Sequence, residues 1–187
     1  MEKDHDQYTK SEEIVDHLFL LDFLCIQAGV KAELVVLGGS GILLQLELNN
    51  HTDFRPTQDI DVNVTSATNF DAIYEQLKKA NIHPVGGVME VPPLEDFQEE
   101  DSRQELDVPF SNIRVFVPSI ELLACCKIFS KREKDLEDLE SSSLLEMCNQ
   151  ELLGDMIAEY EENLLNKHDP NLNLHQLERI LDEKGIV

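Results

Sequence analysis

Residues 33–46, ELVVLGGSGILLQL, run from a short apolar stretch through a glycine-rich joint into a second apolar stretch. Residues 33–37 are rich in β-branched side chains and too few for a helix, which predicts a buried strand. Residues 42–48 predict a short helix. Glycines at such a joint let another group approach backbone N–H donors at the helix end that favours anions. Most such joints are purely structural, and the sequence lacks the patterns of a P-loop and of a dinucleotide fingerprint.

A second strand is predicted over residues 59–64, within the stretch FRPTQDIDV. Asp59 and Asp61 are two residues apart and so point to one side of this strand, while Ile60 and Val62 face the core. Two adjacent carboxylates repel each other unless a cation lies between them. Mg²⁺ suits such a pair, because it binds a few carboxylates together with water and substrate phosphates. The alternative is that both carboxylates simply face solvent.

The remaining patterns predict an α+β fold. A capping box at Thr9 and Glu12 starts a helix that Gly29 ends, and Asn69 caps a helix over residues 70–80. Further strands are expected at residues 85–91, 104–110 and 113–117, with a solvated acidic loop at 92–104 and helices after 118 that break near 141–143 and 169–170. We expect a small mixed sheet with helices packed on one face, an α/β core over residues 1–118 and a helical part over 119–187.

The charge of the chain limits its partners. Its 187 residues include 15 Lys and Arg against 38 Asp and Glu, for a formal net charge of -23. Such a surface repels nucleic acid and anionic membrane, which excludes nonspecific nucleic-acid binding and favours a basic partner protein or a polycation. No apolar run approaches the ~20 residues of a membrane span, and no signal peptide is visible, so we expect a cytoplasmic protein.

A basic cluster stands out in this acidic chain: Lys127, Lys131, Arg132 and Lys134. On one continuous helix, Lys127, Lys131 and Lys134 would share a face. They would then contact a triphosphate or a site carboxylate, or else form a solvated face balanced by neighbouring acids.

Two segments together resemble the polymerase-β-like nucleotidyltransferase superfamily. The first combines VVLGGS with R-x-T-x-D-I-D-V, here Arg55, Thr57, Asp59, Ile60, Asp61 and Val62. The second, PSIELLACCKIFSKREKDLEDL, is similar to a segment of the small bacterial group that includes abortive-infection toxins and uncharacterised nucleotidyltransferase-like proteins. In that group a helical lysine precedes a basic residue, Lys-Asp and a further Asp, which correspond here to Lys127, Arg132, Lys134-Asp135 and Asp138.

The resemblance implies transfer of a nucleotidyl group from a nucleoside triphosphate to a hydroxyl acceptor, with pyrophosphate leaving. Asp59 and Asp61 would hold two Mg²⁺ ions. The resemblance also implies a third carboxylate on a later strand, best matched by Asp107, with Glu90 and Glu105 as substitutes. The residues that would contact the nucleotide are Gly38, Gly39, Ser40, Arg55, Thr57 and Lys127.

Three functions remain open at this point. The first is an active metal-dependent nucleotidyltransferase, with a role in a toxin-antitoxin or phage-defence pair. The second is a catalytically silent relative that binds a nucleotide or a partner. The third is a drug-modifying nucleotidyltransferase, because the acidic residues between 95 and 101 would attract an aminoglycoside-like polycation.

Overall fold

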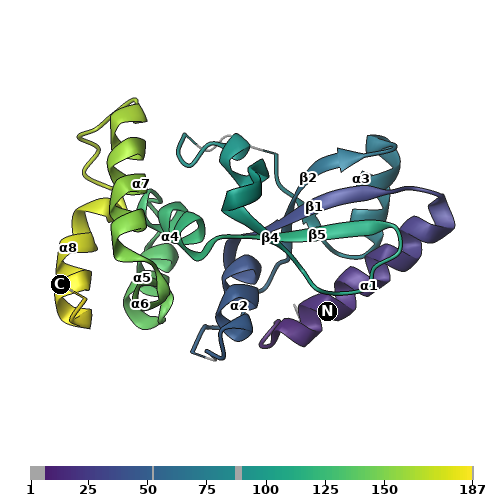
Figure 1. Cartoon of the computed structure of the whole chain (residues 1–187), viewed down its shortest axis with the longest axis horizontal. Coiled ribbons are helices and arrows are strands. Elements are labelled where there is room, and N and C mark those ends of the chain that lie inside the picture. The colour runs from purple at the N-terminus through teal and green to yellow at the C-terminus, as the bar shows by residue number, and fades with distance from the viewer. Residues whose placement is uncertain (1–6, 52, 87–89, 187) are drawn as a thin grey trace, which may run out of the picture.

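A mixed sheet of five strands forms one end of the molecule, and helices gather at the other end (Figure 1). The computed structural model describes residues 7–51, 53–86 and 90–186. The strands lie in the order β3-β2-β1-β5-β4 and are β1 (Ala32–Leu37), β2 (Asp61–Ala67), β3 (His83–Pro84), β4 (Arg103–Glu105) and β5 (Ile113–Pro118). The α-helices are α1 (Ser11–Ala28), α2 (Gly38–Leu48), α3 (Phe70–Lys79), α4 (Ile120–Ile128), α5 (Glu133–Ser141), α6 (Leu144–Met147), α7 (Gln150–Asn163) and α8 (Leu177–Lys184). Short 3-10 helices are η1 (Leu94–Gln98), η2 (Glu100–Ser102) and η3 (Asn173–Gln176).

The central strand β1 pairs antiparallel with β2 and parallel with β5. Its side chains alternate between the two faces of the sheet. Leu34 and Val36 are fully buried on the face that helices cover. On the opposite face Glu33 pairs with Arg114 of β5, and Val35 is fully buried too. The predicted α+β fold, with helices packed on one face of a mixed sheet and a helical C-terminal part, is confirmed.

The predicted strands 33–37 and 113–117 match β1 and β5, but other boundaries differ. Strand β2 begins at Asp61, so Asp59 precedes it. Strand β4 ends at Glu105, because the chain then makes two turns in which the N–H of Val108 donates to the Leu106 carbonyl and that of Phe110 to the Val108 carbonyl. Pro109, which has no N–H, also disfavours a continued ladder. The expected strand 85–91 includes residues 87–89, which lie outside the described residues.

The expected solvated loop at residues 92–104 is a packed cover instead. Phe97 of η1 is fully buried and Pro92 is buried too, so this segment contributes to the core in spite of its acidic residues. The reason is that the 3-10 turns direct the single aromatic side chain inward, while the other carboxylates stay exposed and that of the half-buried Asp96 accepts the hydroxyl of Tyr160 at 2.6 Å.

One helix prediction also needs correction. The first helix has Lys10 as its N-cap, and the Glu13 carboxylate, not that of Glu12, accepts the N–H of Lys10 at 3.0 Å. In the C-terminal part, the breaks near residues 141–143 and 169–170 are confirmed, and the second is long, because α7 ends at Asn163 and η3 begins at Asn173. The expected caps by Gly29 and Asn69 are confirmed.

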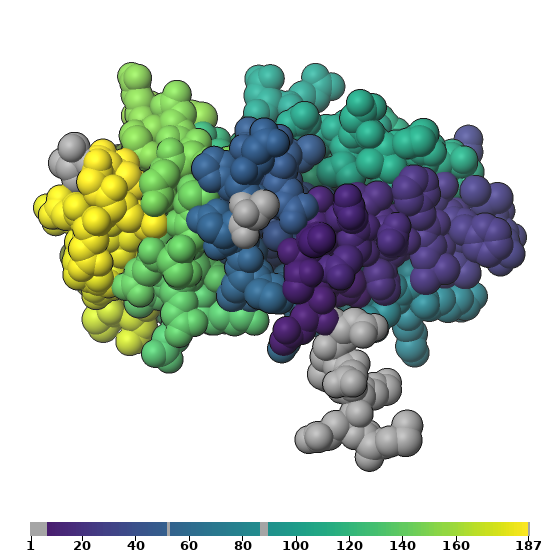
Figure 2. Space-filling model, turned by 90° about the horizontal axis from the view of Figure 1, so that it is seen from below, coloured from purple at the N-terminus to yellow at the C-terminus, as the bar shows by residue number. Residues whose placement is uncertain are grey.

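Helix α1 carries apolar side chains on both of its faces. Its inner face includes Leu18 and Leu21, which are fully buried. Large apolar side chains remain exposed on its outer face, namely Phe19, Leu20, Phe23 and Ile26. Figure 2 shows α1, in purple, along the surface beside α2. In the part of the chain that the structure describes, no helix is long and apolar enough to cross a membrane.

Asp22 fixes α1 to the sheet. Its buried carboxylate accepts the backbone N–H groups of Ser111 at 2.9 Å, Asn112 at 2.7 Å and Ile113 at 3.0 Å, at the start of β5. We predict that Asp22→Ala lowers the free energy of unfolding by about 1–3 kcal/mol or more, because it leaves buried donors without an acceptor. Urea denaturation measures this loss. Asp16→Ala, an exposed change on the same helix, is the control, and equal effects of both variants would contradict the role of Asp22.

Candidate functional site

A cavity of about 530 Å³ lies between the end of the sheet and the C-terminal helices. The charged residues of its lining, called the charged wall below, are Asp61, Glu90, Lys127, Lys131, Arg132 and Asp135. The apolar residues of its lining, called the apolar wall, include Val91, Leu94, Phe97, Phe129, Leu164 and Leu172. A lining with both kinds of residue suits a ligand with an anionic part and a flat apolar part.

Gly38 brings the start of α2 against the Asp61 carboxylate. Its φ of +60° is in the left-handed region, and a Cβ at this position would lie 3.0 Å from Asp61 Oδ2. Both constraints select glycine, since any other side chain would be strained and would crowd the carboxylate. The glycine-rich joint therefore allows the first turn of α2 to approach Asp61 closely at the cavity wall.

The surroundings of the Asp61 carboxyl disfavour its charged form. Among the described residues, no side chain makes a hydrogen bond or an ion pair with it. Burial, followed by the negative charge of Asp59, raises its pKa above the ordinary value of 3.8. The charges of His83, Arg132 and Lys127 lower the pKa, but by less. Asp59 is half exposed, and its Oδ1 lies 3.9 Å from Nε2 of His83.

Lys127 is almost fully buried, with 3% of its surface exposed, and its ammonium contacts two buried aspartates. It is hydrogen-bonded to Asp135 Oδ1 and lies 2.9 Å from Asp138 Oδ2. Arginines complete the network. Arg132 Nε lies 2.7 Å from Asp135 Oδ2, and Arg55 forms two bonds with Asp138, at 2.5 and 2.8 Å. Although burial alone would raise the pKa of Asp135, the hydrogen bond from Arg132 and the charge of Lys127 lower it.

Asn173 holds the connection between α4 and α5 in place. Its side-chain amide donates to the carbonyl of Lys127 at 3.0 Å, and its backbone N–H donates to the carbonyl of Ser130 at 2.9 Å. The Ser130 hydroxyl in turn donates to Asp135 at 2.6 Å. Because α4 ends at Ile128 and α5 begins at Glu133, the expected continuous basic helix does not form. Lys131 lies in the connection, and Lys134 is exposed on α5 and does not line the cavity.

Of the residues that the sequence predicts to contact a nucleotide, the structure places Gly38 and Lys127 on the cavity wall. The other four, Gly39, Ser40, Arg55 and Thr57, do not line the cavity. The buried Ser40 hydroxyl donates to the Leu37 carbonyl at 3.0 Å, and a Cβ on Gly39 would lie 2.9 Å from Thr57 Oγ1. The Thr57 hydroxyl donates to the carbonyl of Asp59 at 3.2 Å. Arg55 is bound to Asp138, as described above.

The structure does not bring Asp107 to the Asp59–Asp61 pair. Asp61 lies opposite Leu37 at one end of β1, whereas Asp107 is exposed beside the start of β5, which pairs with Ala32 at the other end. The two positions are roughly 10 to 15 Å apart along the strands alone, which is too far for a shared metal pair.

Neither expected substitute completes a group of three carboxylates. Glu105 pairs with Arg114 at 2.7 Å. Glu90 lines the cavity but accepts the backbone N–H of Leu165. Within residues 7–51, 53–86 and 90–186, no group of three or more His, Cys, Asp or Glu side chains is arranged to hold a metal ion.

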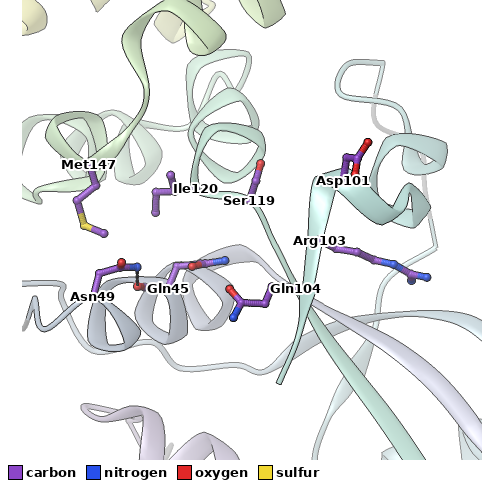
Figure 3. A pocket seen from close by; sticks show the side chains of 8 residues that line it. All are labelled: Gln45, Asn49, Asp101, Arg103, Gln104, Ser119, Ile120 and Met147. Carbon is purple, nitrogen blue, oxygen red and sulfur yellow. Dashed lines mark hydrogen bonds between the residues drawn. The ribbon is translucent and has the colours of Figure 1, made fainter. Parts of the chain in front are cut away.

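A second hollow, of about 370 Å³, lies between α2, β4 and the start of α4 (Figure 3). Two of its polar side chains are hydrogen-bonded to the backbone. Gln45 donates to the carbonyl of Pro118 at 2.6 Å, and the Ser119 hydroxyl accepts the N–H of Leu122. Figure 3 also shows that the Arg103 side chain points away from the other residues of this hollow.

Sequence reasoning missed the apolar wall and the clamp by Asn173. Phe97 lies in an acidic segment, and Leu164 and Leu172 flank a nonhelical stretch, so periodicity gives no signal for them. Asn173 follows Asn171 and Leu172 in a polar stretch that looks like any surface loop.

One comparison with known proteins gives a match, to a protein family. Residues 3–181 match the family described as "Nucleotidyltransferase of unknown function (DUF6036)". The match covers nearly the whole chain, so the protein belongs to this family. No curated protein and no solved structure matches the chain.

The raised pKa of Asp61 predicts that this residue lowers the stability of the folded state in a pH-dependent way. The folded state holds this proton more tightly than the unfolded state, so ionisation of Asp61 destabilises the fold above the raised pKa. We predict that Asp61→Asn raises the melting temperature at pH 7 and that this gain shrinks as the pH falls toward 3.8. Calorimetry over this pH range measures the effect. Asp107→Asn, an exposed change, is the control. A lower melting temperature of Asp61→Asn at pH 7 would show that the carboxylate stabilises the fold.

The buried ion pairs of Lys127 predict a large loss of stability when this residue is replaced. Lys127→Met leaves Asp135 and Asp138 without their shared cation, and we expect the free energy of unfolding to fall by about 3–5 kcal/mol. Adding Asp135→Asn should recover part of this loss, because it removes one of the two like charges. Lys131→Met is the matched control. The side chain of Lys131 is more than half exposed, so a loss of about 0–1 kcal/mol is expected from its pair with Asp169. Strictly additive losses in the double variant would rule out the coupling.

Proposed function

We propose that this member of the nucleotidyltransferase family is a metal-dependent enzyme that moves a nucleotidyl group from a nucleoside triphosphate to a hydroxyl acceptor. One observation carries the proposal. The Asp61 carboxylate, which has a raised pKa and makes no ion pair with any described residue, lines the same cavity as Lys127 and Arg132. A carboxylate in this state suits a cation that arrives with the substrate.

The residues present fit magnesium that enters with a nucleotide. Mg²⁺ is commonly held by one or two carboxylates, with phosphates and water as its other ligands. Asp61 and Asp59 supply that number. The absence of a third acid in the described residues fits a site in which the substrate provides the remaining ligands. When bound, magnesium would neutralise the phosphates and lower the pKa of a coordinated hydroxyl.

The two walls of the cavity suggest how a nucleotide would lie. Its phosphates would meet Gly38 at the start of α2 and the cationic side chains of Lys127, Lys131 and Arg132. Its base would lie against the apolar wall near Phe97 and Phe129. This orientation satisfies the charge of the triphosphate while burying the flat base.

The reaction would proceed on the α-phosphorus. The acceptor hydroxyl oxygen attacks it, and the bond to the bridging oxygen breaks, so pyrophosphate leaves. Lys127 and Arg132 would stabilise the negative charge that develops on the leaving group. Asp59, half exposed and close to His83, has room to accept the proton of the hydroxyl.

A silent binding relative is the second candidate, and one observation favours it. Asp59 and Asp61 interact with each other, but among the described residues no third acid completes a metal-binding group with them. Such a protein would bind a nucleotide without transferring it. The drug-modifying activity and the toxin-antitoxin or phage-defence role stay predictions from the sequence.

Titration calorimetry with each nucleoside triphosphate, with and without magnesium, tests the proposal. We expect magnesium-dependent binding that weakens at least ~10-fold in Asp61→Asn and in Asp59→Asn. The control is Lys134→Gln, because Lys134 is exposed and does not line the cavity. Unchanged magnesium-dependent affinity in both aspartate variants would refute the assignment of the metal site.

A second assay separates the enzyme from the silent relative. The protein is incubated with α-labelled nucleotides, magnesium and a cell lysate. Label in a product, accompanied by pyrophosphate, supports the enzyme. Tight binding with neither product nor pyrophosphate supports the silent relative, and the chemical nature of the labelled product identifies the acceptor.

A further inference from the structure

Helix α1 carries two stripes of side chains at the spacing of a helix–helix seam. Spacings that alternate between three and four residues keep side chains on one side of a helix, and this repeat is typical of helices that pair with another helix. The inner stripe is fully buried and consists of Ile14, Leu18, Leu21 and Cys25. The outer stripe is exposed and consists of Glu12, Asp16, Phe19, Phe23 and Ile26. The fold therefore covers one of the two seams and leaves the other open.

The outer stripe divides into an acidic half and an apolar half. Glu12 and Asp16 lie toward the start of α1, and neither side chain makes a hydrogen bond or an ion pair with any described residue. The three apolar side chains lie toward the end of the helix and are between 42 and 55% exposed. Single exposed apolar side chains are common on protein surfaces, whereas a continuous row of them marks a contact surface.

The apolar half is held in place before any partner binds. The ring of Phe19 packs against that of Phe110, and their centres are 5.0 Å apart. Phe110 precedes Ser111, whose backbone N–H donates to the carboxylate of Asp22 on α1. A surface that is already ordered loses little conformational freedom on binding, so more of the contact energy remains as affinity.

The charge of α1 determines which partner fits. The helix has four acidic residues and no Lys or Arg. A second copy of the chain would bring the same unpaired acids and the same net charge of -23 to the contact. A lipid surface is disfavoured too, because helices that lie on membranes carry Lys and Arg beside their apolar face. A basic partner avoids this repulsion and supplies cations for the two exposed carboxylates.

We propose that the outer stripe of α1 binds an amphipathic helix of a basic partner protein. Apolar side chains of the partner lie against Phe19, Phe23 and Ile26. Its Lys or Arg side chains pair with Glu12 and Asp16. The proposal goes beyond the proposed function and does not depend on it, because α1 does not contribute to the lining of the candidate cavity. Figure 1 shows α1 and the helices α7 and α8 at opposite ends of the molecule.

Two synthetic helical peptides serve as probes for this contact. In both, one half of the seam is Leu, and the other half is Lys in the first peptide and Glu in the second. Fluorescence anisotropy measures their binding at about 0.15 M salt, which screens long-range attraction to the acidic surface as a whole. We expect saturable one-to-one binding of the Lys peptide and an affinity at least ~10-fold lower for the Glu peptide. No saturable binding of the Lys peptide, or equal binding of both peptides, overturns the proposal.

Charge reversal locates the acidic half of the contact. The double change Glu12→Lys and Asp16→Lys should exchange the preference, so that the Glu peptide becomes the tighter ligand. Glu151→Lys with Asp155→Lys is the matched control, because these two acids are also exposed, four residues apart and near the start of a helix, α7. An unchanged preference in the first double variant, or an exchanged preference in the control as well, contradicts the proposed contact.

A single apolar change locates the other half. Phe23→Ser should weaken binding of the Lys peptide at least ~10-fold, because aromatic side chains dominate the affinity of such contacts. Phe70→Ser on α3 is the control, since Phe70 is exposed to a similar extent, and it should leave the affinity unchanged. Equal losses in the two variants would show that the peptide does not select the outer stripe. Circular dichroism checks that each variant is folded.

The Phe23→Ser variant also distinguishes two other occupants. Sedimentation velocity of the protein alone tests for a second copy, and flotation with phosphatidylcholine vesicles tests for a lipid surface. We expect neither self-association nor vesicle binding through the outer stripe. Self-association or vesicle binding that Phe23→Ser abolishes would assign the stripe to that occupant and overturn the proposal. None of these measurements involves a nucleotide, so failure of the proposed function would leave their results unchanged.

Discussion

A buried ammonium is the constraint on which the candidate site depends. Lys127 can stay charged inside the protein only if carboxylates surround it, and Asp135 and Asp138 of α5 do so. Asp138 also binds Arg55, which precedes the strand that carries Asp61. One chain of ion pairs therefore connects α4, α5 and the entry to β2. These contacts fix the positions of Lys127 and Arg132 relative to Asp61.

The distribution of charge makes the cavity unlike the rest of the surface. A net charge of -23 repels anions from most directions, whereas the lining of the cavity is balanced, with Lys127, Lys131 and Arg132 against Asp61, Glu90 and Asp135. An anion therefore meets less repulsion at this cavity than at the rest of the surface, and small anions reach it more easily than extended polyanions. The basic partner protein stays a prediction. Such a partner would contact the acidic surface and the exposed apolar side chains of α1.

Local patterns predicted much of the fold, and nonlocal pairing explains what they missed. The strand before Gly38, the pair Asp59 and Asp61 and the caps at Gly29 and Asn69 all depend on residues close in sequence. The sequence motif already included Asp135 and Asp138 together with Lys127. It could not show that Lys127 contacts these two aspartates and not Asp61, because that depends on how α5 folds back toward α4. Asp107 was assigned from alternation in a segment that leaves the ladder after Glu105. Nothing in the sequence indicates that both carboxylate oxygens of Glu105 would bind Arg114.

The clamp by Asn173 has a consequence for the order in which the protein forms. The sheet, Asp61 and the glycine joint are complete once residue 118 has been made, whereas the cavity also needs Leu164, Leu172 and the amide of Asn173. Because domains begin to fold from the N-terminus during synthesis, the carboxylate pair exists on the ribosome before the wall that would hold a nucleotide against it. A nascent chain therefore carries an incomplete site until its last helices emerge, and binding competence arrives late in translation.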